Sequence, residues 1–517
     1  MSRLHNRSAL RLAAAVATVA MLLFAAVGLN FASIFSSSVF SGLADRPGGA
    51  FNIVIACLSI PMLSMLCMYL FRGRVCVALG IFIIALNVSG RAADYFGVAA
   101  YTFDYDNFEQ RVSLTTALLA LLLLFVLLSH RQSTIHSSPA RRFRLMFLVF
   151  ACLTTVSQFL NHSPWSAAWL SIGAVWQYFG LLLIISHSVR SLADVRFLLK
   201  CIAGTLIVSA LIRFGVRGES IFSFTNAGAF ARLGSVTFGP YVYYAGTVSL
   251  VIITTLWLLS SSRDMPSIVT WAVVLCFLGT ELLVKVTQGG YLSVLTAGLG
   301  ILWKRERRFF LGFLGCGCAL YVAVGQWVST VVTSRGLALS PSVLERQTVA
   351  ARLWLDAEGI PHFFDRFGFG YGIGRSLYFS NSLYYSGRPL PMHSMILETS
   401  QMAGGLATLA LLLCFAYVGM RLWRLSTRES PFASCGLYLL LALSAWFVFA
   451  NTTGVGILCY APYEATILMY VIMFMGMKLT EFEDARRAMT LRACSRYPAF
   501  ESVNAFAVLG GEETHKG

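Results

Sequence analysis

The chain has 517 residues, of which 57% are hydrophobic and only 12% are charged, and its mean hydropathy is +0.72. These values lie outside the range of soluble globular domains and predict a polytopic membrane protein. The net charge of +16 does not indicate a nucleic-acid partner. Cytoplasmic loops of membrane proteins collect lysine and arginine, and the chain has no basic domain interleaved with aromatic residues.

Apolar windows long enough to cross roughly 30 Å of hydrocarbon recur along the chain. Each is expected to form a helix, because a segment in lipid must satisfy its own backbone, and together they predict an all-α fold of about 12–14 transmembrane helices. The first window is longer than the apolar core of a usual signal peptide and is interpreted as a span. The windows are 9–31, 51–71, 75–90, 112–129, 143–160, 166–186, 195–213, 240–260, 266–284, 289–303, 309–328, 394–419, 433–451 and 457–477.

The distribution of basic residues predicts the orientation of these spans. If the N-terminus is cytoplasmic, strict alternation places most of the lysine and arginine on the cytoplasmic side, as the positive-inside rule requires. Both termini are then cytoplasmic. The predicted organisation is N-terminal transmembrane helices over 1–328, a large outer loop over 329–393, C-terminal transmembrane helices over 394–477, and a poorly ordered cytoplasmic tail over 478–517.

The cysteines do not predict a metal site. Nearly all of the twelve lie in apolar windows, and the outer loop contains none. No C-x-x-C pair and no cysteine–histidine spacing typical of a metal site occurs, so they are interpreted as small buried hydrophobic residues. Neither a metal nor a cofactor is predicted.

Arginines on the outer side are the first candidates for chemistry, because a guanidinium can grip phosphate oxygens in pairs. Arg232 precedes the window that starts near Tyr241, where a lipid-linked phosphate would lie; the alternative is an ordinary interfacial anchor. The outer loop contains arginine but no lysine, which the general preference of this chain for arginine also explains. Its arginines are Arg335, Arg346, Arg352, Arg366, Arg375 and Arg388.

The outer loop also contains a glycine-rich segment and ends at a histidine. The glycines of Gly368–Gly374 permit positive φ angles and a close approach of backbone N–H groups to a ligand. His393 stands where the loop meets the next apolar window, and its imidazole can act as a general base or merely anchor a helix. Glu398 follows inside that window, where a carboxylate is costly and therefore a functional candidate. It would orient the imidazole or bond to a neighbouring helix.

These features, in this order, resemble the O-antigen ligase/polymerase superfamily of bacterial membrane glycosyltransferases. The resemblance covers roughly residues 231–412. Three positions depart from the family pattern: Ser394 replaces the usual Asn, Ala407 stands where a second Gly is common, and Gln288 begins Gln-Gly-Gly where members often have Ser-Arg-Gly. The matching residues are Arg232, Arg352 with Trp354, the turn Gly368–Gly374, His393 with Leu397, and Gly404.

The resemblance implies an inverting, metal-independent transfer of a glycan from an undecaprenyl-diphosphate carrier to a sugar hydroxyl. The reaction would take place on the periplasmic face of a bacterial inner membrane. Arg232 and Arg352 would stabilise the departing diphosphate, with Arg346 as a reserve phosphate ligand. His393 would accept the proton of the attacking hydroxyl. Glu398 and Gly404 would support this site.

The acceptor distinguishes the two members of this family. A polymerase would elongate a second lipid-linked glycan and is slightly favoured, whereas a ligase would use lipid A–core. Membrane lipid and proteins that set chain length or export polysaccharide are further candidate partners. A lipid-linked oligosaccharide flippase or another transporter is the main alternative, although transporters usually keep their loops short. A scaffold protein is a third, and it predicts that the outer loop can be mutated freely.

Overall fold

The computed structural model describes the chain in part, and within that part every regular element is a helix, as the all-α prediction requires. The described residues are 65–66, 68–70, 72–95, 114–128, 138–163, 165–217, 241–285, 288–305, 308, 311, 360–361, 364–372, 394–453 and 463–496. The helices are α4 (Val75–Tyr95), α5 (Leu114–Leu128), α6 (Ser138–Leu160), α7 (Trp165–Ser188), α8 (Leu192–Arg217), α10 (Tyr241–Ser261), α11 (Met265–Lys285), α12 (Gln288–Arg305), α16 (Met395–Ala403), α17 (Gly405–Ser426), α18 (Ala433–Thr453) and α19 (Tyr463–Arg496).

Four helices within the described residues are long and apolar enough to cross a membrane. They contain Pro139–Leu160, Met265–Leu282, Gly405–Ser426 and Ala433–Asn451. Such a stretch satisfies its own backbone hydrogen bonds and matches the thickness of the hydrocarbon layer. The membrane class predicted from composition is therefore supported by length and apolar content together.

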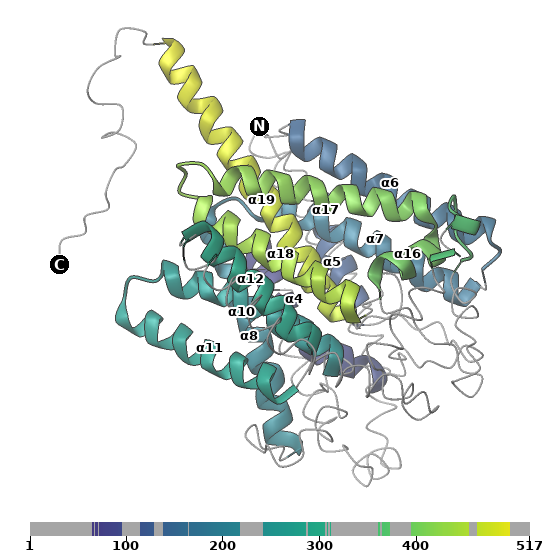
Figure 1. The fold of residues 1–517 in the computed structure, drawn as a ribbon, viewed down its shortest axis with the longest axis horizontal. Coiled ribbons are helices and arrows are strands. Elements are labelled where there is room, and N and C mark those ends of the chain that lie inside the picture. Colours follow the sequence, from purple (N-terminus) through teal and green to yellow (C-terminus); the bar gives the residue numbers. More distant parts are fainter. Residues whose placement is uncertain are drawn as a thin grey trace, which may run out of the picture.

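The helices form a bundle in which α6 and α17 lie side by side (Figure 1). Helix α18 packs against α10, α12 and α17, and α19 contacts α7, α17 and α18. The C-terminal part of α19 projects beyond the bundle, as its yellow end shows in Figure 1. Short α16 contacts α6, α17 and α18, so it lies where three longer helices meet.

Large apolar side chains point outward from α6 and α17 at helical spacing. On α17 they recur every three to four positions or at twice that spacing, which places them on one face. A contiguous exposed stripe of this kind suits a lipid environment better than water. The exposed members are Leu145, Val149, Val156, Phe159 and Leu160 on α6, and Leu406, Leu409, Leu413, Met420 and Trp423 on α17.

The centre of the bundle contains a cluster of aromatic rings. Tyr178 of α7 stacks on Tyr470 of α19 with ring centroids 4.3 Å apart. Phe147 of α6 meets Tyr470 and Phe474 edge to face, at 5.6 and 5.5 Å. Such aromatic pairs stabilise the fold by more than the burial of their surface alone, because ring edges and ring faces carry opposite partial charges. The cluster therefore holds α6, α7 and α19 together.

Contacts between helix ends bring several basic residues to one end of the bundle, here called the basic end. The Tyr417 hydroxyl of α17 donates to Pro139 O at the start of α6 over 3.3 Å. Lys304 at the end of α12 donates to Ser426 O at the end of α17. Exposed arginines lie near the start of α6 and the end of α17; they are Arg141, Arg142 and Arg424.

Two expectations about element boundaries are wrong. The single span predicted over 394–419 is divided at Gly404 into α16 and α17. The segment from 478 onward was expected to be poorly ordered, yet α19 continues to Arg496. Leu479 and Glu483 are buried there, and ion pairs secure Glu483, so this part of α19 packs as a helix although it is polar. The windows 9–31 and 309–328 fall outside the described residues, apart from Leu311.

Candidate functional site

Gly404 separates α16 from α17 and adopts a backbone conformation that favours glycine. Its φ is 89° and its ψ is 162°, a region essentially closed to residues with a Cβ atom. The Gly404 N–H still donates to Ser400 O over 2.9 Å, and Thr408 N donates to Gly404 O over 3.1 Å. The chain therefore changes direction at Gly404 while keeping its backbone hydrogen bonds.

Residues 366–372, here called the docked turn, lie directly against this break. Gly405 N donates to Phe367 O over 2.6 Å, and Tyr371 N donates to Gln401 O over 2.7 Å. These bonds satisfy a donor at the start of α17 and an acceptor at the end of α16, groups that a helix end leaves open. The docked turn therefore joins the two helices by backbone bonds.

Close backbone contact explains why glycine occupies both sides of this junction. Gly370 has a φ of 64°, and a Cβ there would lie 2.6 Å from Gln401 O and 2.6 Å from Gly404 N. A Cβ on Gly404 would lie 2.6 Å from the Cα atom of Phe369 and 2.7 Å from the backbone nitrogen of Gly370. Real Cβ atoms essentially never approach so closely. The two glycines thus allow two backbones to touch.

The C-terminal end of α6 holds the docked turn from a third direction. Asn161 Nδ2 donates to Phe369 O over 2.8 Å, and the Ser157 hydroxyl donates to the same oxygen. Gln158 Nε2 donates to Met402 O of α16 over 3.1 Å. Uncharged side chains of α6 therefore bind backbone carbonyls of the turn and of α16.

The exposed side of this junction carries ionisable groups. The Arg366 guanidinium lies 5.0 Å from the centroid of the Tyr371 ring, in a cation–π arrangement. Burial raises the pKa of the Tyr371 phenol, Asp365 raises it further, and Arg366 opposes the change. His162 is exposed at the end of α6 and has a φ of 47°, which is uncommon for a residue with a side chain.

Ser394 begins α16 as its N-cap. Its hydroxyl accepts from Leu397 N, as serine and asparagine commonly do at this position. Asn451 Oδ1 of α18 accepts from Ile396 N over 3.2 Å and lies 3.3 Å from the Ser394 hydroxyl. Ser394 therefore supplies the same capping chemistry that an asparagine would supply at this position.

Glu398 is buried near the start of α16, with only 2% of the residue exposed. Neither of its carboxyl oxygens has a hydrogen-bond partner among the described residues, and the same is true of Thr399 Oγ1 and Gln401 Nε2. Buried polar groups are nearly always hydrogen-bonded, so unpartnered groups gathered on one short helix call for an explanation. Burial of polar groups without partners is costly, and in a membrane protein it marks a candidate functional position.

The structure places two of the residues predicted from the sequence. Glu398 and Gly404 belong to α16 and to the junction that receives the docked turn. The other predicted site residues, His393, Arg232, Arg352 and Arg346, lie outside the described residues. His393 directly precedes the N-cap Ser394 in the sequence.

The contribution of α6 was missed by the sequence analysis. Ser157, Gln158, Asn161 and Ser163 form a polar run at the end of an otherwise apolar window. That change of composition was the available signal. It does not identify a partner more than two hundred residues away, and the bonds from Ser157 and Asn161 reach Phe369.

The arrangement fixes the docked turn against the junction of α16 and α17. The groups that attach the turn are backbone amides, backbone carbonyls and uncharged side chains, so the attachment itself leaves ionisable groups free for chemistry. No cluster of three or more His, Cys, Asp or Glu side chains suited to a metal ion occurs among the described residues. The residues that form the junction therefore have a structural role: they hold the docked turn, α16 and α17 in fixed relative positions.

Comparisons with known proteins do not assign the chain to a group. No family model matches it, and no curated protein matches it significantly.

Proposed function

We propose that this chain is an integral-membrane glycosyltransferase that polymerises or ligates glycans linked to undecaprenyl diphosphate. One observation carries the proposal: the docked turn is bonded to the α16–α17 junction. Two motifs that carry the family resemblance, the glycine turn and the helix that follows His393, are adjacent in space although the sequence separates them. The contact fixes part of the predicted outer loop beside the helix that follows His393, as a site formed by both segments would need.

The proposed reaction requires a leaving diphosphate, an attacking hydroxyl and a base. The hydroxyl oxygen of the acceptor bonds to the anomeric carbon as the bond from that carbon to the diphosphate oxygen breaks, with inversion. Arg232 and Arg352 stabilise the charge that develops on the diphosphate, and Arg346 is the reserve ligand. His393 accepts the proton of the hydroxyl. The donor is the lipid-linked glycan, and neither metal nor cofactor is required.

Glu398 is proposed to position His393. It lies one helical turn beyond Ser394, the residue that follows the histidine, and its carboxyl group has no hydrogen-bond partner within the part of the chain that the structure describes. A carboxyl group that accepts a hydrogen bond from an imidazole fixes the tautomer and orientation of that ring. The burial of Glu398 would then serve to exclude water from the same interaction.

The proposed topology places the docked turn in the periplasm and the basic end in the cytoplasm of a bacterial inner-membrane protein. The supporting observation is that Arg141, Arg142 and Arg424 lie near helix ends on the side of the bundle away from the turn. Such asymmetry is typical of the cytoplasmic side. The number of spans is proposed to be about 12–14.

The test is the substitution His393→Ala in cells that make the surface glycan, with His362→Ala as the matched histidine control in the same predicted loop. We expect glycan elongation or attachment to stop in the first variant and to continue in the control. Lipid-linked single repeats should then accumulate on the outer leaflet, while the protein inserts normally. Glu398→Gln should reduce transfer by about tenfold or more, since positioned proton transfer contributes on this scale.

The possible outcomes separate the alternatives. Glycan of normal length in His393→Ala would show that the histidine is not catalytic. Accumulation of repeats on the inner leaflet would instead indicate a flippase. A polymerase extends the lipid-linked repeat in the absence of lipid A–core, whereas a ligase requires that acceptor, so purified acceptors distinguish these two activities. A polymerase is slightly favoured.

A further inference from the structure

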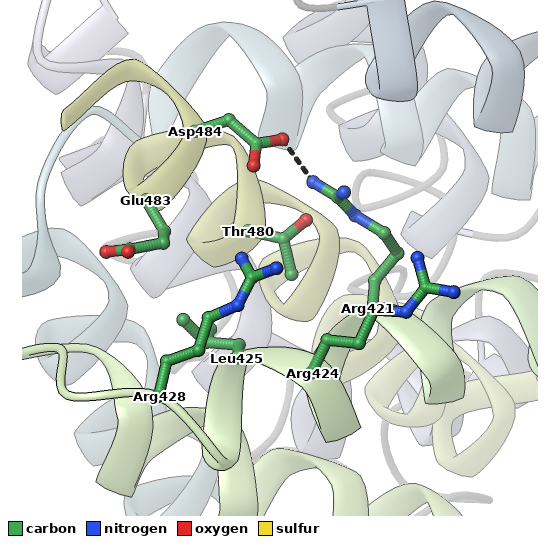
Figure 2. A pocket seen from close by; sticks show the side chains of 7 residues that line it. All are labelled: Arg421, Arg424, Leu425, Arg428, Thr480, Glu483 and Asp484. Atoms are coloured by element: carbon green, nitrogen blue, oxygen red, sulfur yellow. Dashed lines mark hydrogen bonds and ion pairs between the residues drawn. The ribbon is translucent and has the colours of Figure 1, made fainter. Parts of the chain in front are cut away.

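Helices α17 and α19 form a pocket at the basic end, far from the docked turn. Figure 2 shows arginine side chains of α17 on the side that faces α19, with Arg421 reaching Asp484. Thr480 and Glu483 of α19 line the same pocket as Arg424 and Arg428 (Figure 2). The pocket is therefore formed by two helices at the point where both reach the end of the bundle.

The acidic groups of this pocket already have partners. Asp484 is paired with Arg421. Glu483 accepts from Arg486 over 2.9 Å, from Arg487 over 2.7 Å and from Ser430 over 2.7 Å. Arg486 donates a second bond over 3.0 Å, so four hydrogen bonds occupy about the four lone-pair sites of the Glu483 carboxylate. Neither acid therefore neutralises the remaining arginines of α17.

Arg424 and Arg428 are the two arginines of this pocket whose side chains have no partner among the described residues. Their side chains make no hydrogen bond or ion pair with any described residue, and the neighbouring exposed Glu429 makes none with them. They lie four residues apart, on one face of the last turn of α17 and the loop after it. At the same end of α17, Lys304 donates to Ser426 O.

The depth of these arginines in a membrane follows from their neighbours. The apolar span ends at Ser426. Trp423 is 50% exposed and Met420 is 54% exposed, so both face outward. Tryptophan is enriched where lipid tails give way to headgroups. Arg424 and Arg428 are therefore expected at the level of lipid phosphates.

We propose that Arg424 and Arg428 bind the phosphate of an anionic phospholipid headgroup. Two guanidinium groups one helical turn apart can each donate paired hydrogen bonds to phosphate oxygens. The negative surface of a membrane attracts arginines that lie at this level. The outward-facing Trp423 and Met420 can contact the acyl chains of the same lipid. This site is independent of the proposed transfer reaction, since it lies at the opposite end of α17.

The experiment measures lipid binding by the full chain purified in a neutral detergent. Phosphatidylglycerol is titrated while thermal unfolding is followed, and phosphatidylcholine with the same acyl chains and inorganic phosphate are titrated separately. We expect phosphatidylglycerol to raise the melting temperature of the wild type more than either of the others. A ligand that binds only the native state stabilises it, and at equal concentration the ligand with the lower Kd stabilises it more.

The substitutions Arg424→Gln and Arg428→Gln together should weaken the apparent affinity for phosphatidylglycerol by about tenfold or more. The control removes two exposed arginines from other loops, through Arg190→Gln and Arg263→Gln, and should bind as the wild type does. Replacing both pocket arginines with lysine retains the charge without the forked geometry, and should give an intermediate affinity.

Unchanged affinity of the Gln variant for phosphatidylglycerol would overturn the proposal. An equal loss of affinity in the control would do so as well, because any two charges would then suffice. If inorganic phosphate reproduces the whole stabilisation, the pocket binds a free anion and the lipid assignment is wrong. If the Gln variant does not fold, the lysine variant decides: affinity equal to that of the wild type excludes the forked contact.

Discussion

The two ends of α17 are held in place by different kinds of interaction. At its start, the docked turn and α6 attach through backbone groups and uncharged amide or hydroxyl side chains. At its end, Arg421 pairs with Asp484 of α19, and Glu483 binds two arginines of its own helix. The strength of hydrogen bonds between uncharged groups changes little with pH or salt concentration. The strength of ion pairs changes with both. The first end therefore suits a fixed geometry, and the second suits a charged membrane surface.

The largest effect is expected from Gly404→Ala, which should disrupt the start of α17 without changing its end. The backbone conformation of Gly404 costs roughly 1–3 kcal/mol for a residue with a Cβ, and the added atom meets the backbone of the docked turn. We expect a fall of several degrees or more in the melting temperature and loss of the proposed transfer activity.

The matched control is Gly419→Ala in the same helix. A Cβ there would lie 3.8 Å from Leu440 Cδ1, which is ordinary contact, so stability should be equal or slightly higher. If Gly404→Ala behaves like this control in thermal unfolding, the close backbone contact does not exist in the protein.

An intermediate effect is expected from Asn161→Ala. The change removes the bonds from Asn161 Nδ2 to Phe369 O and to Ser157 O. Loss of a buried bond of this kind costs roughly 1–3 kcal/mol. Hydrogen exchange should accelerate at the Tyr371 amide, which the docking protects.

The control for this change is Thr270→Ala on α11, which removes an exposed bond to Pro266 O, away from the turn. Exchange at Tyr371 should stay slow in that variant. Equal exchange at Tyr371 in Asn161→Ala and in the wild type would show that α6 does not hold the turn.

The smallest effect is expected at the other end, from titration of Glu483. Burial alone would raise the pKa of this carboxyl, but hydrogen bonds from Arg486, Arg487 and Ser430 outweigh it and lower the pKa to about 2. The group ionises at a lower pH in the folded state, so its stabilisation is complete above the ordinary value of 4.5 and is lost as the pH falls toward 2.

The contribution is roughly 1–2 kcal/mol, because the side chains of Arg486 and Arg487 are 42% and 43% exposed and solvent screens the pairs. Melting temperatures between pH 7 and pH 3 should fall less steeply in Glu483→Gln than in the wild type. The exposed Glu429 serves as the control, and Glu429→Gln should follow the wild-type curve. Parallel curves for all three proteins would contradict the assignment.

Within the described residues, hydropathy predicted helices such as α11 and α18, because the backbone hydrogen bonds of a helix lie within the helix itself. The window 433–451 corresponds to α18 at Ala433–Thr453, and 266–284 corresponds to α11 at Met265–Lys285. The break within 394–419 could not be predicted in this way. Gly404 is visible in the sequence, but its positive φ depends on a turn that comes earlier in the chain.

The site was predictable only in part for the same reason. Glu398 was found because a carboxylate within an apolar window stands out against its neighbours. Asn161 was not found, because an amide at the end of a span is ordinary until its partner is known. The ion pairs of Glu483 were missed because a mixed-charge segment after the last span resembles a disordered tail.

The distance along the chain between α6 and the docked turn has a consequence for biosynthesis. Asn161 is made 208 residues before Phe369, whose carbonyl it binds. At ordinary rates of translation the ribosome needs roughly 10–40 s to cover that interval. During this time the side-chain amides of Gln158 and Asn161 have not yet met their partners Met402 and Phe369. A gene divided after codon 328, where the predicted outer loop begins, should therefore still yield working protein when both fragments are made together, because α6 is already synthesised before the docked turn.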